Sequence, residues 1–281
     1  MVSGRGRRIV SHSGRRWVIG KGYRPGAAIK PYSKSAMVPT ITQQHRQEME
    51  QRGFTLFEDV FTLEEMAELA TIVDEYEKRR QAELAQMEGG TESISRAGEI
   101  TFNNHLAEQD ERIRAFVTRP EFVALTTAFL GPDTNLYWNQ TVFKHPEGDK
   151  EFPWHQDDAY TPVVPTPYLT LWLAINDATI ENGCVSLLPG SHKGGLRPHR
   201  NSPIGLVGHE NDHPDQGVPM PVRAGSIACF WSLTLHRSAP NRSKGIRKAF
   251  VIQYSPVGLR YQASGDEVPD LIPVARNGVA A

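Results

Sequence analysis

The pattern of apolar and polar positions predicts helices in the first part of the chain and strands in the second. Residues 44–52 have the spacing of a short amphipathic helix that stops at Gly53, and the apolar run 54–57 is typical of a strand. A further helix is predicted over residues 120–130, where a proline stands at the first position and Gly131 follows the last.

The strongest helix signal follows the run 54–57. Thr62 and Glu65 have the spacing of a capping box, in which each side chain bonds to the backbone N–H of the other residue. Phe61 and Met66 are placed as the apolar pair of a hydrophobic staple. Apolar residues then recur at helical spacing, which predicts a helix that continues to about Glu88.

In the second half the apolar period changes from helical spacing to two. Short predicted strands separated by Pro, Gly and Asn turns, without helix-length segments between them, favour an antiparallel sandwich or barrel over a parallel sheet. The loop 193–221 is rich in Pro, Gly and His and is too long for a simple hairpin, so it is a candidate lid. The predicted strands cover residues 135–144, 168–175, 184–188, 225–231 and 248–254.

The composition is that of an ordinary globular protein with one large domain or two small ones, at 281 residues and 39% hydrophobic. Two cysteines, Cys184 and Cys229, are too few for a disulfide-stapled scaffold or a four-thiolate zinc site. No apolar run reaches the roughly 18 residues that a membrane span needs, and the N-terminus lacks a secretory apolar stretch. These features predict a cytoplasmic protein without membrane association.

The net charge of -1 hides an asymmetry along the chain. Residues 1–40 contain nine Lys or Arg and no Asp or Glu. Taking those nine from the 31 basic residues leaves 22 against 32 acidic residues, so the remainder is about ten charges negative. This excess gives no support for a nucleic-acid substrate.

Residues 1–39 are therefore expected to be a basic, disordered extension of a folded domain that covers residues 40–281. Three interpretations of the extension stay open. It is an inert upstream translation, since Met37 stands at the junction, or a targeting segment, or an arm that binds nucleic acid through phosphate contacts.

The sharpest local signal for chemistry is the segment 152–158, Phe-Pro-Trp-His-Gln-Asp-Asp. Residues two apart in a strand point to the same face, so His155 and Asp157 can offer an imidazole and a carboxylate to one metal ion. The pair alone is also compatible with a solvated loop, because His-x-Asp occurs by chance.

A second cluster, residues 235–247, follows the apolar strand 227–231 and supplies His236 and several cations. Two histidines and one carboxylate on one face of an octahedron leave three positions open, which is the geometry of non-haem Fe(II) oxygenases. Two of those positions can chelate a 2-oxo acid, and the third can take dioxygen.

With these residues in place, the chain resembles the phytanoyl-CoA dioxygenase (PhyH) family of Fe(II)/2-oxoglutarate-dependent oxygenases over roughly residues 40–260. The joint occurrence of four motifs in one order makes the resemblance specific. They are Trp-His-Gln-Asp at 154–157, the strand 171–175 before Glu-Asn-Gly-Cys at 181–184, Leu-Pro-Gly-Ser-His at 188–192, and the His236 cluster that ends at Arg247.

The resemblance implies a fold and a metal site. The fold is mainly β with flanking α-helices, a double-stranded β-helix of the cupin-like jelly-roll type with helices on one outer face. His155, Asp157 and His236 are implied as the ligands of Fe(II).

The resemblance also implies a co-substrate site. Arg247 matches the arginine that holds the distal carboxylate of 2-oxoglutarate, a role that suits the two parallel donors of a guanidinium. Ser238 and Trp172 match co-substrate contacts, and Gln140 and Lys144 fall where the family places further ones.

The implied activity is hydroxylation of a C–H bond of a small organic substrate by O2, with release of succinate and CO2. Asp157 argues against the halogenating branch, in which a small residue replaces the carboxylate ligand. Desaturation or cyclisation stays open. So do two other interpretations, a cupin metalloenzyme that does not use 2-oxoglutarate and a catalytically silent binding protein of the same fold.

The primary substrate cannot be identified from the motifs, because loops rather than motif residues form the pocket walls. Residues 92–105 and 193–221 are the candidate wall segments. We expect a monomer or homodimer with a small-molecule substrate and no nucleic-acid partner.

Overall fold

The computed structural model describes residues 8–10, 16–18, 38–146, 151–208 and 217–281. The chain divides into two units, Met1–Tyr32 and Ser33–Ala281. In the first unit β1 (Arg8–Val10) pairs with β2 (Arg16–Val18) in antiparallel fashion. The other residues of the expected extension, up to residue 37, lie outside the described residues.

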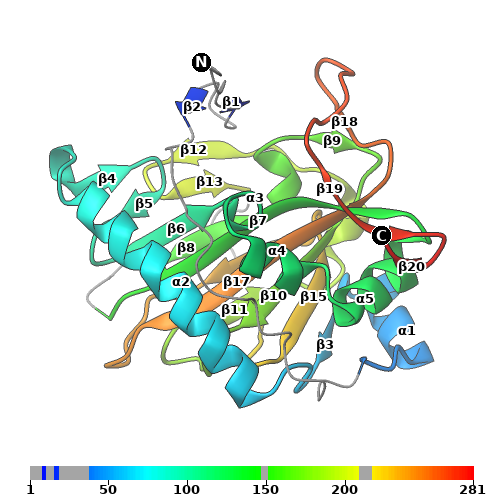
Figure 1. Cartoon of the computed structure of the whole chain (residues 1–281), viewed down its shortest axis with the longest axis horizontal. Helices are drawn as coiled ribbons and strands as arrows, with labels where there is room; N and C mark the ends of the chain where they lie inside the picture. The colour runs from blue at the N-terminus through cyan, green and yellow to red at the C-terminus, as the bar shows by residue number, and fades with distance from the viewer. Residues whose placement is uncertain (1–7, 11–15, 19–37, 147–150, 209–216) are drawn as a thin grey trace, which may run out of the picture. The chain divides into compact units, whose positions relative to one another are not determined.

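The second unit is built on a ten-stranded sheet with antiparallel pairing between its strands (Figure 1). Its central strands are buried on both faces, as expected for a sheet covered on two sides. In order across the sheet the strands are β3 (Phe54–Phe57), β15 (Ile227–Trp231), β10 (Leu169–Ala174), β17 (Arg247–Pro256), β7 (Thr134–Lys144), β6 (Ile100–Asn104), β5 (Ser95–Arg96) and β4 (Thr91–Glu92), with β19 (Ile272–Arg276) paired to β7 and β20 (Val279–Ala280) paired to β19.

A second, four-stranded sheet faces the interior side of the large one. An apolar cluster, which includes Phe102, Trp172 and Phe230 from the large sheet and Val185 and Leu187 from the small one, fills the space between them. Two antiparallel sheets around one core confirm the predicted jelly roll. The order of the small sheet is β14 (Val218–Pro219), β11 (Val185–Leu187), β16 (His236–Ser238) and β8 (Phe152–His155).

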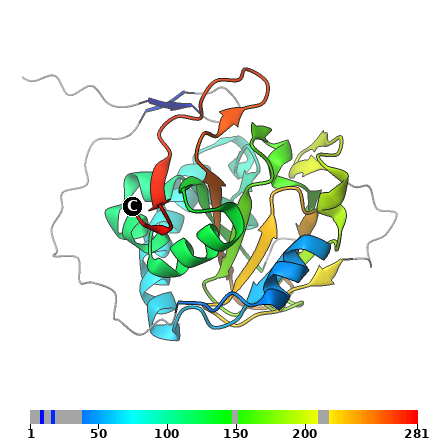
Figure 2. The same ribbon diagram turned by 90° about the vertical axis from the view of Figure 1, so that its right-hand side faces the viewer.

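Helices cover the outer face of the large sheet (Figures 1 and 2). Lys248 Nζ on β17 donates to Asp74 of α2 at 2.7 Å, and Tyr254 Oη donates to the Val117 carbonyl of α4 at 2.7 Å. No described helix is both long and apolar enough to cross a lipid bilayer. The helices are α1 (Gln43–Gln51), α2 (Leu63–Leu84), α3 (Leu106–Gln109), α4 (Glu111–Val117) and α5 (Pro120–Leu130), with 3-10 turns η1 (Glu88–Gly90), η2 (Asp157–Ala159) and η3 (Ser191–Gly194).

The start of α2 confirms the capping-box prediction, and its end differs from the prediction. Thr62 Oγ1 accepts from the Glu65 N–H, and Glu65 Oε2 accepts from the Thr62 N–H at 2.8 Å. The helix ends at Leu84 rather than near Glu88, because the Met87 N–H bonds to the Leu84 carbonyl three residues back and tightens the chain into a turn.

Gly53 joins α1 to β3 in a conformation that favours glycine. Its φ is +88°, and a Cβ at this position would lie 2.4 Å from Nδ1 of His192 and 2.7 Å from Oγ1 of Thr234. The Gly53 carbonyl accepts from Thr234 Oγ1 at 2.9 Å. Gly53, which the sequence predicted to end the helix, is therefore also in close contact with the chain just before β16.

The segment 193–221, predicted as a lid, contains regular structure where it is described. β12 (Arg200–Ser202) and β13 (Gly205–Val207) form a hairpin, and β14 joins the small sheet. Residues 209–216 lie outside the described residues. A second short pair, β9 (Val163–Val164) and β18 (Arg260–Tyr261), lies elsewhere in the unit.

A buried carboxylate links α2 to the large sheet. Glu77, 7% exposed, accepts bonds from Thr101 Oγ1 at 2.7 Å, Asn103 Nδ2 at 3.0 Å and Gln81 Nε2 at 2.8 Å. Burial alone would raise the pKa of Glu77, but its hydrogen bonds, that with His145 first, hold the pKa below its ordinary value. The carboxylate is therefore retained in its charged form by donors from α2, from β6 and from His145 beyond the end of β7.

Replacing Glu77 by Gln is expected to lower the free energy of unfolding by about 2 kcal/mol, because an amide N–H faces donors that need an acceptor. Glu68→Gln, at an exposed position of the same helix, is the matched control and should change stability little. Urea denaturation of both variants measures the difference. Equal midpoints for the two variants would contradict this account of the contact between α2 and β6.

Candidate metal centre and active site

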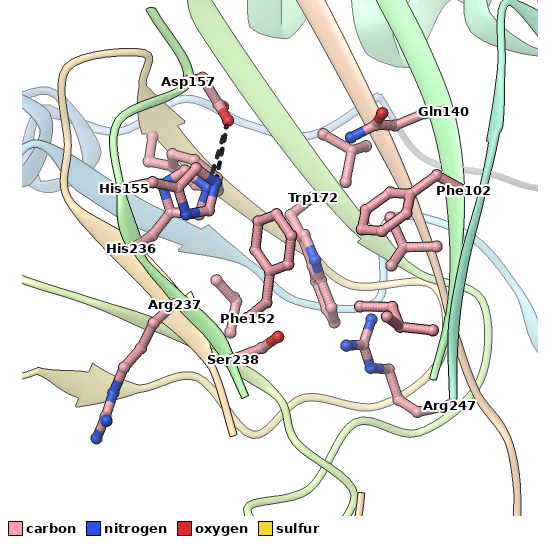
Figure 3. A pocket seen from close by; sticks show the side chains of 15 residues that line it. Phe102, Gln140, Phe152, His155, Asp157, Trp172, His236, Arg237, Ser238 and Arg247 are labelled. Carbon is pink, nitrogen blue, oxygen red and sulfur yellow. Dashed lines mark ion pairs between the residues drawn. The ribbon is translucent and has the colours of Figure 1, made fainter. Parts of the chain in front are cut away.

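A cavity that is partly open to solvent lies between the two sheets. Three polar side chains, His155, Asp157 and His236, stand at one end, and Arg247 stands at the other (Figure 3). Apolar walls separate the two ends. They include Phe102, Val142, Trp172, Phe230 and Val251.

The two histidines are held together by strand pairing. His236 of β16 is the cross-strand partner of His155 of β8, and the two ring centroids lie 4.0 Å apart. Adjacent strands in register place such a pair on the same face of the sheet. One pair of short strands thus brings together two histidines that are 81 positions apart in the sequence.

Backbone carbonyls fix which nitrogen of each ring faces the cavity. His155 Nδ1 lies 2.8 Å from the Pro153 carbonyl, and His236 Nδ1 lies 3.0 Å from the Thr234 carbonyl. Because a carbonyl only accepts, each Nδ1 carries the proton and donates it. Both Nε2 lone pairs are left free to bind a metal ion.

Asp157 follows β8 directly and completes the cluster. Its Oδ1 lies 3.7 Å from His155 Nε2 and 3.4 Å from His236 Nε2. Its Oδ2 accepts from Thr170 Oγ1 of β10 at 2.7 Å, which turns Oδ1 toward the histidines. The ligand atoms of the three residues lie within 4.8 Å of one another.

The burial of this cluster determines its protonation. Burial and the neighbouring His236 lower the pKa of His155 to about 4, so its imidazole is neutral at pH 7. Burial alone would raise the pKa of Asp157, but the two facing histidines outweigh it and hold the pKa well below its ordinary value. Neutral imidazole and ionised carboxylate are the forms that bind metal.

The donor set fits Fe(II). Two imidazole nitrogens and one carboxylate oxygen converge from one side and leave the cavity side open, as in the two-histidine, one-carboxylate facial triad. The second contacts of each ligand, to two carbonyls and one hydroxyl, orient it in the way that metal ligands require.

Arg247 is a buried cation whose donors lack acceptors. The side chain is 1% exposed, and its Nε and Nη1 have no hydrogen-bond partner among the described residues. Burial lowers the pKa of Arg247 to about 10, which still leaves it charged at pH 7. Since a buried guanidinium without partners is costly, the site suits an anion with two acceptor oxygens. A carboxylate of 2-oxoglutarate meets that requirement.

Trp172 and Ser238 lie between this cation and the metal cluster. The guanidinium carbon of Arg247 is 5.3 Å from the centroid of the Trp172 ring. Both Trp172 and Ser238 line the cavity.

Lys144 is not among the residues that line the cavity, and it contacts Ser238 instead. Its Nζ donates to Ser238 Oγ at 2.8 Å and to the Ser238 carbonyl at 2.9 Å. Ser238 Oγ accepts this bond and keeps its own proton for another acceptor. Burial, and after it the charge of Arg247, holds the pKa of Lys144 well below its ordinary value.

Gln140 lies on the cavity wall with its amide orientation fixed. Trp138 Nε1 donates to Gln140 Oε1 at 3.2 Å. The indole N–H is only a donor, so the oxygen of Gln140 faces Trp138 and the amide nitrogen is turned toward the cavity (Figure 3). Gln140 therefore offers a hydrogen-bond donor to a bound molecule.

Two residues that position the cluster were missed in the sequence. Thr170 could have been found from the sequence, because it stands two residues before Trp172 and side chains two apart in a strand point to the same face. Gln156 was passed over between the two ligands. Its buried amide donates to the Leu233 carbonyl at 2.6 Å and thereby ties the His155 segment to the chain before His236.

The predicted wall segments contribute unequally. Ile100 and Phe102, from the segment 92–105, line the cavity. No described residue of the segment 193–221 lines the cavity. This segment instead contacts Gln156, the residue between the ligands His155 and Asp157. His199 Nε2 accepts from the Gln156 N–H at 3.0 Å, and the Arg197 N–H bonds to Gln156 Oε1 at 2.8 Å.

Proteins of known sequence resemble the chain over most of this unit. The chain is 29% identical over 231 residues to a probable alpha-ketoglutarate-dependent hypophosphite dioxygenase of Stutzerimonas stutzeri. The matched region covers 76% of this chain and 78% of that protein. It is 28% identical over 165 residues to the peroxisomal phytanoyl-CoA dioxygenase of Bos taurus. That match covers 55% of this chain and 49% of the bovine protein, so it spans about half of the relative's length.

Solved structures share the fold. The alpha-ketoglutarate-dependent carbocyclase SnoK from nogalamycin biosynthesis superposes with a TM-score of 0.66 at 20% identity, covering 84% of this chain and 99% of that one. EvdO2 from Micromonospora carbonacea var. aurantiaca, complexed with 2-oxoglutarate, gives a TM-score of 0.61 at 23% identity, covering 83% and 97%. These matches confirm the double-stranded β-helix.

Family membership follows from the sequence match together with the site. Residues 49–249 match the family model of phytanoyl-CoA dioxygenase (PhyH), and the His-Asp-His cluster lies within that span. Fe(II) and 2-oxoglutarate are the cofactors of this group. The chain therefore belongs to the phytanoyl-CoA dioxygenase family of 2-oxoglutarate-dependent non-haem iron dioxygenases.

Proposed function

We propose that this protein hydroxylates a C–H bond of a small organic substrate and releases succinate and CO2. The observation that carries the proposal is that the His155, Asp157 and His236 cluster and the partnerless donors of Arg247 line one cavity. When bound, Fe(II) and 2-oxoglutarate supply the oxidising chemistry, in which dioxygen is reduced and the 2-oxo acid is decarboxylated.

His155, Asp157 and His236 are proposed to hold Fe(II). The protein's contribution is orientation before the metal arrives, because each ligand is already fixed by a second hydrogen bond. The ligands occupy one side, so the cavity side stays available to co-substrate and dioxygen.

Arg247 is proposed to bind the distal carboxylate of 2-oxoglutarate with two parallel N–H donors. Ser238 is proposed to donate its hydroxyl proton to the same carboxylate, since Lys144 occupies the acceptor side of that oxygen. Trp172 forms the wall beside them. Lys144 then acts on the co-substrate through Ser238 rather than by direct contact.

Gln140 is proposed to donate its amide N–H to the end of 2-oxoglutarate nearer the metal. Its orientation, set by Trp138, supports this role. The apolar side chains between the two ends exclude water from the reacting groups, which protects a reactive centre from side reactions.

Purified protein supplied with Fe(II), ascorbate and 2-oxoglutarate is expected to form succinate, and to form it faster with its primary substrate. Hypophosphite and phytanoyl-CoA belong in the substrate panel because relatives are named for them. A cupin metalloenzyme of another kind would not consume 2-oxoglutarate, and a silent binding protein would bind without turnover. Absence of both 2-oxoglutarate binding and turnover across the panel would refute the proposal.

Asp157→Ala is expected to reduce iron-dependent succinate formation by ~100-fold or more, because it removes the only carboxylate of the cluster. Asp266→Ala, at an exposed position, serves as the matched control. Iron content after dialysis and the rate of succinate formation are both measured. Wild-type iron content and rate in the Asp157 variant would remove this residue from the metal site.

Arg247→Lys is expected to weaken 2-oxoglutarate binding by ~10- to 100-fold, because an ammonium group keeps the charge but loses the two parallel donors. The variant should still bind Fe(II). Arg260→Lys, whose side chain is half exposed, is the control. Titration of each protein with 2-oxoglutarate gives the affinities, and an unchanged value for the Arg247 variant would show that the carboxylate binds elsewhere.

A further inference from the structure

Arg96 is a cation near the edge of the large sheet, and most of its donors have no acceptor. Its Nη2 donates to the Pro203 carbonyl, and its buried Nε has no hydrogen-bond partner among the described residues. Arg96 forms no ion pair with a described carboxylate. The carboxylate of Glu92, on the neighbouring strand β4, is paired with Arg80 at 2.7 Å instead. Since a guanidinium has five N–H donors, Arg96 keeps donors for a further acceptor.

Strand register places Arg96 one strand outside the cavity wall. Arg96 of β5 is the cross-strand partner of Ile100 of β6, and Ile100 lines the cavity. Directly paired residues point to the same face of a sheet, so Arg96 lies on the interior face of the large sheet. Its side chain is partly exposed, so a bound molecule can reach it from solvent.

The hairpin formed by β12 and β13 connects Arg96 with the small sheet. Pro203, which accepts the bond from Arg96, lies in the turn between these two strands (Figure 1). Gly205 of the same hairpin lies against Phe152 of β8, since a Cβ on Gly205 would be 3.1 Å from Phe152 Cζ. Phe152 lines the cavity and is partly exposed. Arg96 and Phe152 therefore lie at one rim of the cavity, and the hairpin contacts both.

The Phe152 ring links this rim to the metal cluster. Its centroid lies 4.8 Å from that of His155 and 5.5 Å from that of Phe102 on β6. Phe102 also lines the cavity (Figure 3). A molecule that extends from Arg96 to the metal cluster therefore passes an apolar aromatic surface. An anionic group bound at Arg96 is kept apart from the ionised Asp157 by that surface.

We propose that Arg96 binds an anionic oxygen group of the primary substrate, a carboxylate or a phosphate ester, and that the apolar body of this substrate extends past Phe152 to the metal cluster. The inference rests on the proposed function and adds the substrate class. A guanidinium with unused donors suits a planar or tetrahedral oxyanion. A neutral substrate would not use the charge of Arg96, an ammonium group would be repelled by it, and an inorganic oxyanion lacks an apolar body to contact Phe152.

The test compares probes that share one alkyl chain: hexanoate, hexyl phosphate, hexanol and hexylamine, with hypophosphite as an anion without a chain. The full chain is loaded with Mn(II) and saturating 2-oxoglutarate in the absence of oxygen, so that Arg247 is occupied and no turnover takes place. Calorimetry measures each affinity in the wild type, in Arg96→Gln, which removes the charge, and in Arg96→Lys, which keeps it. Arg260→Gln, whose side chain is half exposed, is the matched control.

The expected result is that hexanoate or hexyl phosphate binds the wild type more tightly than hexanol, hexylamine and hypophosphite do. Arg96→Gln should weaken binding of that anion by ~10- to 100-fold, the range for loss of a charged hydrogen bond. Arg96→Lys should cause a smaller loss, and Arg260→Gln should bind like the wild type. Added salt should weaken anion binding in the wild type more than in Arg96→Gln. The better of the two anions identifies the group as a carboxylate or a phosphate ester.

Three results would overturn the inference: no binding by either organic anion, equal anion affinity in the wild type and Arg96→Gln, or an equal loss of hexanol and anion binding in that variant. The last result would show that Arg96 only holds the hairpin in place. Each of these can occur while the wild type still binds and turns over 2-oxoglutarate. A wild type that fails to do so would instead refute the proposed function, so the two failures are distinguishable.

Discussion

The pairing of His155 with His236 is the contact on which the rest of the site depends. It comes from the register between β8 and β16, two strands of only four and three residues. A slip of one residue in either strand would turn its histidine to the opposite face of the sheet and separate the two rings. Gln156, bonded to the Leu233 carbonyl, helps to fix that register from the side. The bond from Thr170 to Asp157 then ties the small sheet to the large one at the same place.

The site keeps a buried cation, Arg247, and a buried amino group, that of Lys144, where the core could have held apolar side chains. Arg247 and Lys144 are each 1% exposed, and neither forms an ion pair with a described carboxylate. Isolated buried charges are destabilising, and the surrounding apolar cluster between the sheets has to offset that cost. The arrangement favours the binding of an anion, because a bound anion supplies the hydrogen-bond acceptors that Arg247 lacks among the described residues.

The metal ligands and the main strands could be predicted from the sequence because their signals are local. Two-residue spacing brings His155 and Asp157 together, and alternation marks β7, β10 and β17. The role of Lys144 could not be predicted, since its contact with Ser238 joins positions 94 residues apart. Local periodicity also extended α2 to Glu88, past the turn at Met87.

The difference in charge between the two ends of the cavity fixes how a dicarboxylate can lie in it. One end offers the guanidinium of Arg247, and the other offers a metal-binding cluster whose own carboxylate is ionised. Without a metal ion, a second carboxylate would be repelled by Asp157, whereas a divalent cation reverses that sign. Metal binding and co-substrate binding should therefore be coupled: the metal creates the attraction at one end, and Arg247 supplies it at the other throughout.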